Sequence, residues 1–217
     1  MKLRSLEKIK SALVLVPALP EGDHPINVDQ AEINKYLREP QMAASPLGIQ
    51  ITSVRDQMVV FFASKIVLED QSDITPQSTG KLPEVANGII QMLRRQGIDR
   101  YRAYGWNFDA AFDAPGEESA AGLIASSFLN TTVLSKRAQV QALGAGVNIF
   151  FEQSSALCQL KLEPQQQDLN TPRLFAHINY HYELGDDDKP PDLDALRLAY
   201  HGLWGSFLEL VGKLVQP

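Results

Sequence analysis

A stretch near the C-terminus constrains the fold more than any other part of the sequence. From Phe175 to Leu184 the residues alternate in character. Ala176, Ile178, Tyr180, Tyr182 and Leu184 share one face, and Phe175, His177, Asn179, His181 and Glu183 share the other. A period of two is typical of a strand with one buried face. The stretch therefore predicts a strand that belongs to a sheet covered on one side.

A long helix is predicted after this strand. Asp192 is suited to be its N-cap, because an aspartate carboxylate accepts hydrogen bonds from the free N–H groups of a first turn. Steps of three and four residues then separate its apolar members, which are Leu193, Leu196, Tyr200, Leu203, Phe207, Leu210 and Leu214. Such a seam indicates an amphipathic helix lying across a sheet.

Small residues interrupt this helix. Ala199, Gly202 and Gly205 leave little side chain on part of its surface. Each glycine costs about 1 kcal/mol relative to alanine inside a helix, so packing has to supply the stability. We interpret these three positions as a candidate interface where a neighbour comes close.

Other segments predict a similar mixture of elements. Strands are predicted at 12–16, 47–54, 58–70, 101–112, 147–152 and 157–163. Helices are predicted to begin at Asn27, Leu82 and Glu117, and Pro40 and Pro46 bracket a connection. Residues 131–143 fit helix and strand equally.

This order of elements predicts an α+β fold: a mostly antiparallel sheet with helices packed on one face, closed by the long C-terminal helix. The length suits one domain over 1–217. Within it, 44–113 and 117–217 each contain a hairpin, a helix and an aromatic strand, which suggests two similar halves.

Two candidate surfaces follow from the strands. The predicted strand from Met58 is apolar on both faces, so Val59 and Phe61 are expected at an interface with another chain. His177, His181 and Glu183 lie on one strand face, and Asn107 and Asp109 on the small-residue face of another strand. These five polar residues are the candidates for binding a ligand.

A metal site is not expected. On a strand, His177 and His181 lie about 13.5 Å apart, too far to share one ion. His181 and Glu183 would need a third ligand such as His201 or His24. Asp186, Asp187 and Asp188 could hold a hard cation, but a solvated turn before two prolines is the simpler interpretation.

Composition removes several classes of function. The net charge is −6 and the pI is about 5.2, which opposes general binding to nucleic acid. The single cysteine, Cys158, excludes an intrachain disulfide and is expected to be buried. We find no dinucleotide or phosphate-binding loop and no catalytic constellation, so no cofactor is predicted.

The N-terminus does not predict export or membrane insertion. Pro17 and Pro20 follow a short apolar run, and no stretch reaches the 18 apolar residues of a membrane span. We therefore expect a soluble, cytoplasmic protein.

The leading hypothesis is a non-enzymatic protein-binding or assembly subunit that contacts a protein partner or a second copy of itself. A small-ligand protein or enzyme with a pocket between the sheet and the helices is the alternative. A nucleic-acid-associated protein is the third, and it would require a basic concave surface.

Overall fold

A computed structural model describes residues 3–19, 26–78, 80–115, 119–130, 136, 145–185 and 189–215. Its centre is a nine-stranded sheet in the order β2-β3-β4-β5-β1-β6-β9-β8-β7, in which every neighbouring pair is antiparallel. The predicted α+β fold with a mostly antiparallel sheet is confirmed. Within the described residues, no helix is long and apolar enough to cross a membrane.

The strands are β1 (Arg4–Pro17), β2 (Gln41–Ser45), β3 (Gly48–Ser53), β4 (Met58–Phe62), β5 (Ile66–Asp70), β6 (Tyr101–Asp113), β7 (Val147–Gln153), β8 (Ala156–Pro164) and β9 (Arg173–Glu183). The helices are α1 (Gln30–Ile33), α2 (Leu82–Arg95), α3 (Ala120–Phe128) and α5 (Leu193–Leu214), and η2 (Gln165–Gln167) is a short 3-10 turn.

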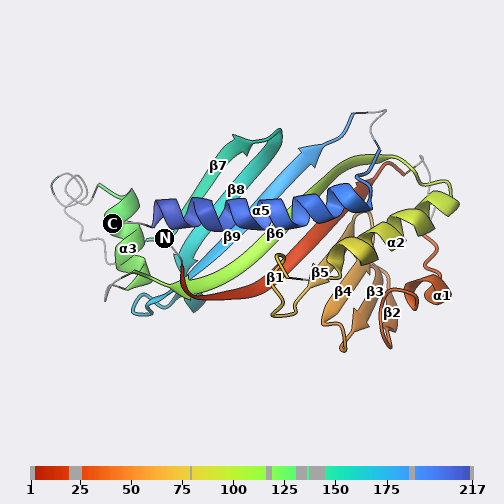
Figure 1. Cartoon of the computed structure of the whole chain (residues 1–217), viewed down its shortest axis with the longest axis horizontal. Helices are drawn as coiled ribbons and strands as arrows, with labels where there is room; N and C mark the ends of the chain where they lie inside the picture. The colour runs from red at the N-terminus through yellow and green to blue at the C-terminus, as the bar shows by residue number, and fades with distance from the viewer. Residues whose placement is uncertain are drawn as a thin grey trace.

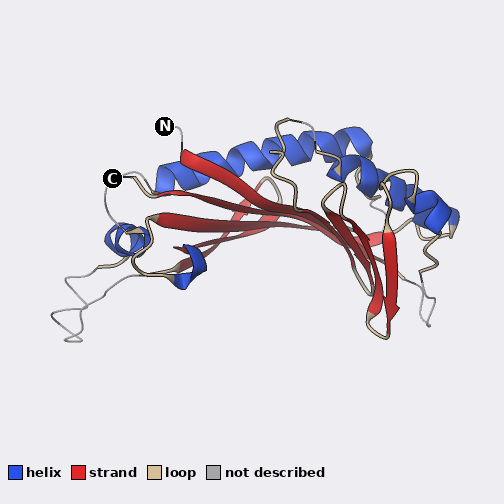
Figure 2. Ribbon diagram, turned by 90° about the horizontal axis from the view of Figure 1, so that it is seen from below, coloured by secondary structure: helices blue, strands red, loops and turns tan. Residues whose placement is uncertain are grey.

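Helices α5 and α2 lie over the same face of the sheet. Figure 1 shows α5 crossing the strands obliquely, with α2 beside its N-terminal end. In Figure 2 the sheet arches beneath these two helices, and its other face lies on the inside of the arch. The predicted long closing helix is therefore confirmed, and it covers one face only.

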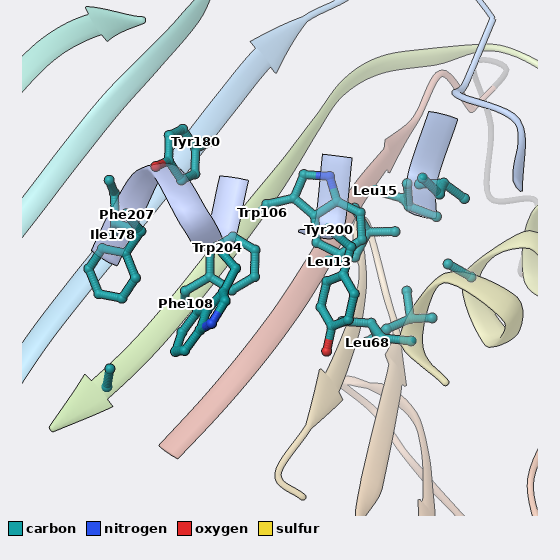
Figure 3. Close-up of a cluster of buried hydrophobic side chains, with 14 of the residues drawn as sticks. Leu13, Leu15, Leu68, Trp106, Phe108, Ile178, Tyr180, Tyr200, Trp204 and Phe207 are labelled. Carbon is teal, nitrogen blue, oxygen red and sulfur yellow. The ribbon is translucent and has the colours of Figure 1, made fainter. Parts of the chain in front are cut away.

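The core lies between the sheet and α5. Figure 3 shows Trp204 and Phe207 of α5 meeting Phe108 and Ile178 of the central strands. Trp204 lies 5.7 Å from Phe108, measured between ring centroids. All four side chains are fully buried, as is Cys158, whose burial was predicted. This packing supplies the stability that the helical glycines remove.

The buried stripe of α5 differs from the predicted seam. Asp192 caps the helix as expected, accepting from the Ala195 N–H at 2.8 Å. The buried side chains, however, include Trp204 and Val211, whereas Leu203 and Leu210 are half-buried. The centre of the stripe is turned toward Trp204, because the indole ring fills the space over Phe108 that a leucine would leave open.

Two strand assignments made from sequence need correction. The segment 58–70, predicted as one strand, is the hairpin β4–β5, which turns at residues 63–65. The supposed connection between Pro40 and Pro46 is strand β2, paired with β3 from Gln41 to Ser45. Prolines restrict the chain next to them but leave five residues free to pair at the edge of a sheet.

Most of the element order of the first half is repeated in the second. β1-α1-β2-β3-β4-β5-α2 is followed by β6-α3-β7-β8-β9-α5. β1 and β6 pair at the centre, and each half extends outward from that pair. Among the described residues, the second half has no counterpart of β2. The halves predicted at 44–113 and 117–217 group the elements differently, and a duplicated origin stays a prediction.

Candidate interaction face

The face of the sheet turned away from α5 and α2 contains all five polar candidates. We call it the open face. In the register, Asn107 lies opposite Asn179 and Asp109 lies opposite His177. His181 lies opposite Gly105, where a Cβ atom would approach the Tyr180 carbonyl oxygen to 2.8 Å. The strand alternation thus groups these residues on one side of the sheet, away from the helices.

A row of charges crosses the open face. Lys10 Nζ lies 3.3 Å from Glu69 Oε1 and 3.8 Å from Asp109 Oδ2. His177 Nδ1 lies 2.5 Å from Asp109 Oδ1. Four strands, β5, β1, β6 and β9, contribute one group each, so acidic and basic groups alternate across the row. The ammonium charge of Lys10 is therefore balanced by carboxylates within the protein.

The row continues onto β8. Lys161 lies opposite His177 in the register, and its Nζ is 2.8 Å from Glu163 Oε2. Next to it, Gln159 lies opposite Asn179 and donates from Nε2 to Asn148 Oδ1 at 3.1 Å. Amide and charged groups thus cover the middle of the open face.

An apolar group adjoins this polar row. Phe61 lies opposite Val67, which lies opposite Val14 in the next strand. Val59 is on the same face of β4 as Phe61, and all four side chains are half-buried. We call Val14, Val59, Phe61 and Val67 the apolar group. Val59 and Phe61 were predicted as interface residues, and here they lie at the surface of the sheet.

Two predicted ligand residues border a hollow. A space of about 350 Å³ is lined by His181, Glu183, Leu157 and three residues of the β7–β8 hairpin. Leu157 is 55% exposed and Glu183 is exposed, so the hollow is shallow. It lies on the open face rather than between the sheet and the helices.

The described residues offer no group of three or more His, Cys, Asp or Glu that could hold a metal ion. His201 is exposed on α5, which covers the other face of the sheet. His24 and the aspartates at 186–188 lie outside the described residues.

The small residues of α5 that were predicted as an interface differ in their surroundings. A Cβ atom added at Gly202 or Gly205 would have nothing within 4 Å. Gly202 is exposed, and Ala199 is half-buried. In the part of the chain that the structure describes, no atom fills the space beside Gly202 and Gly205, whereas Ala199 packs against the core. Their role as an interface stays a prediction.

Two buried ionic clusters escaped the sequence analysis. Lys8 Nζ, fully buried, donates to Asp70 Oδ2 and to the Ser72 carbonyl oxygen at 2.9 Å each. Tyr200 lies 3.1 Å from the same carboxylate. Burial lowers the pKa of Lys8, and the hydrogen bond to Asp70 opposes that shift.

Asp56 forms the second cluster, at the turn between β3 and β4. Its carboxylate accepts from the Arg38 backbone N–H and the Arg38 Nε at 2.7 Å each, and from Lys81 Nζ at 2.6 Å. Burial alone would raise the pKa of Asp56. The hydrogen bonds from Arg38 and Lys81 outweigh it and hold this pKa well below its usual range.

No protein-family model and no curated protein matches the chain. Among solved structures, Methanococcus jannaschii TBP is similar over 94% of this chain and 98% of that one, at 10% identity and a TM-score of 0.32. A likeness at this level carries no conclusion about function.

Proposed function

We propose that this chain is a non-enzymatic protein-binding or assembly subunit whose open face contacts another protein. The observation that carries the proposal is the apolar group of Val14, Val59, Phe61 and Val67. These side chains are neighbours on a sheet face that α5 and α2 leave uncovered. An apolar group bordered by polar residues is typical of a protein interface.

The charges beside the apolar group favour a protein over a nucleic acid. Lys10 is paired with Glu69 and Asp109, and Lys161 with Glu163. Phosphate binding depends on basic groups that are free to displace counterions, whereas these are already neutralised. A partner that offers an apolar centre and mixed charges around it fits the face better.

The polar candidates support the same proposal. A small-ligand site usually encloses most of its ligand. The hollow beside His181 and Glu183 is open, since Leu157 at its border is 55% exposed. We therefore assign His177, His181, Glu183, Asn107 and Asp109 to the polar surround of a protein contact.

The test is native mass spectrometry of the tagged full chain, expressed in and purified from its own source under mild conditions. We expect a complex of defined stoichiometry with a different protein. Phe61→Ser should lose the partner, because it removes the largest member of the apolar group. Cross-links from Lys10 and Lys161 to the partner should place the contact on the open face.

Leu198→Ser is the matched control. Leu198 is 76% exposed on α5 and lies on the other side of the molecule, so the complex should survive. Circular dichroism should show that both variants fold. A chain without a different protein bound, or a complex unaffected by Phe61→Ser, would overturn the proposal.

A further inference from the structure

The two edges of the sheet are protected differently. β2, at one edge, has five residues and is bounded by Pro40 and Pro46. β7, at the other edge, has seven residues and contains no proline, lysine or arginine. Short strands, prolines and lysines are the usual means of preventing an edge from pairing with another chain. The β7 edge lacks them.

The outer side of β7 is unpaired among the described residues. β7 pairs with β8 on its inner side, and the turn at Ser154 and Ser155 has positive φ at both residues, as in a tight two-residue hairpin. In the other half of the molecule, the equivalent strand β3 is covered by β2. Among the described residues, no strand of the second half takes the place beside β7 that β2 takes beside β3.

The sequence of β7 is complementary to itself. We propose that β7 pairs antiparallel with β7 of a second copy, across a two-fold axis at Phe150. Phe150 then lies opposite its own copy, Ile149 opposite Phe151, and Asn148 opposite Glu152. Directly opposite residues share a face, so Phe150, Ile149 and Phe151 each meet an apolar side chain. Val147 lies opposite Gln153 at the ends of the strand, and no like charges meet.

Exposure and packing agree with this pairing. Phe150 is 66% exposed on the open face, so its ring is accessible to a second copy at the edge of the sheet. On the other face, a hollow of about 340 Å³ lies between Phe151 and the last turns of α5. A strand added beside β7 would direct alternate side chains toward that side. β2 does the same in the first half, where Met42 packs against the core.

The experiment measures the oligomeric state of the full chain by size-exclusion chromatography with light scattering. Wild type should be a dimer at high concentration. Phe150→Lys should be a monomer, because it places two lysines opposite each other at the axis. Leu157→Lys is the matched control: Leu157 is 55% exposed on the same face, but on β8, away from the edge. It should remain a dimer.

A charge exchange tests the register. The double variant Asn148→Glu with Glu152→Lys places opposite charges across the axis twice, whereas Asn148→Lys with Glu152→Lys places like charges there. The variant with opposite charges should have a dimer Kd about 2- to 30-fold lower than the variant with like charges. Two single variants repeat the comparison with Glu152 retained. Asn148→Lys places a lysine opposite Glu152, whereas Asn148→Glu places two glutamates opposite each other, so the Asn148→Lys dimer should be the tighter one.

A monomer at the highest soluble concentration would overturn the inference, and so would a dimer that Phe150→Lys leaves intact. The result is separable from the proposed function. Phe61→Ser should release the different protein and keep the dimer, and Phe150→Lys should do the reverse.

Discussion

The two halves of the molecule share most of their element order but bury different kinds of side chain. Among the described residues, the seven largest fully buried side chains all come after residue 100: Trp106, Trp204, Tyr180, Tyr200, Phe108, Phe112 and Phe207. The buried polar and charged residues show the opposite distribution. Of those that the structure describes, Lys8, Ser11, Ser53, Asp56, Asp70 and Ser72 lie in the first half, and only Asp109 lies in the second.

This difference indicates two ways of holding a strand layer beneath a helix. In the second half, α5 is held by aromatic packing, which has little dependence on pH. In the first half, β1, β5 and the turn at Asp56 are held by buried carboxylates with their donors, so charge contributes more. Tyr200 belongs to both systems, because its ring packs on Trp106 while its hydroxyl reaches Ser11 and Asp70.

The largest expected effect is in the second half, where aromatic side chains hold α5. Trp204→Ala should reduce the free energy of unfolding by about 3–5 kcal/mol, because it leaves a large cavity over Phe108. Urea denaturation followed by circular dichroism measures the loss, which should be the same at pH 7 and pH 5.

Trp204→Phe is the control for that loss. The Trp204 Nε1 is buried without a hydrogen-bond partner among the described residues, so phenylalanine removes an unpaired donor and keeps most of the ring. Its cost should be clearly smaller. Equal losses for the alanine and phenylalanine variants would show that ring volume does not stabilise this half.

The next largest loss of stability is expected in the first half, where buried ion pairs hold the strands. Lys8→Met should cost about 3 kcal/mol, at the low end for breaking a buried ion pair. Asp70 would keep three donors: the Ser72 N–H at 2.9 Å, the Ser72 hydroxyl at 2.6 Å and the Tyr200 hydroxyl at 3.1 Å. Thermal and urea unfolding measure the change.

A double variant separates the buried charge from packing. Lys8→Met with Asp70→Asn leaves no unpaired carboxylate, so it should be more stable than Lys8→Met alone. If the losses in free energy of unfolding for Lys8→Met and Asp70→Asn simply add in the double variant, the ion pair does not hold β1 to β5. Buried charge would then not distinguish the first half from the second.

The sequence predicted what depends on local periodicity. The alternations at 101–112 and 175–184 correctly separated the buried face of each strand from its polar face, which carries Asn107 and Asp109 on one strand and His177 on the other. β2 was missed because its two prolines indicate a connection. The hairpin β4–β5 was missed because Phe62 to Ile66 contains no glycine or proline to indicate a turn.

Contacts between distant segments could not be predicted. Lys8 and Asp70 are 62 residues apart, and Ser11 and Tyr200 are 189 apart. A lysine in a polar N-terminal segment gives no sign that its ammonium group will be buried. The Asp109–His177 contact was equally hidden, since it depends on the register between β6 and β9. Only the alternation that sets their common face was visible.

A smaller, pH-dependent effect is expected at Asp56. Asp56→Asn should cost about 2 kcal/mol at pH 7, because Arg38 and Lys81 can return to water when the charge is lost. The pKa of Asp56 is lowered in the folded protein, so its contribution is complete above the unfolded value of about 3.9 and declines as the pH falls further. The difference between wild type and variant should therefore shrink below about pH 4.

Glu39→Gln is the control for this pH dependence. Glu39 pairs with Arg55 near the same turn, but both side chains are more than 60% exposed, so the substitution should change stability little at any pH. A gap between wild type and Asp56→Asn that stays constant from pH 7 to pH 3 would contradict the role of the charge.

The smallest effect, and the only gain, is expected on the helices that cover the two halves. Gly202→Ala should stabilise the protein by about 0.5–1 kcal/mol, because a Cβ there meets nothing within 4 Å and alanine favours the helix. Gly88→Ala on α2 should do the opposite, since its Cβ would collide with the Tyr36 ring. Gly202→Ala also tests the predicted interface at Gly202. If the variant is more stable and still binds its partner, the glycine is not needed for the contact. A more stable variant that loses the partner shows that it is.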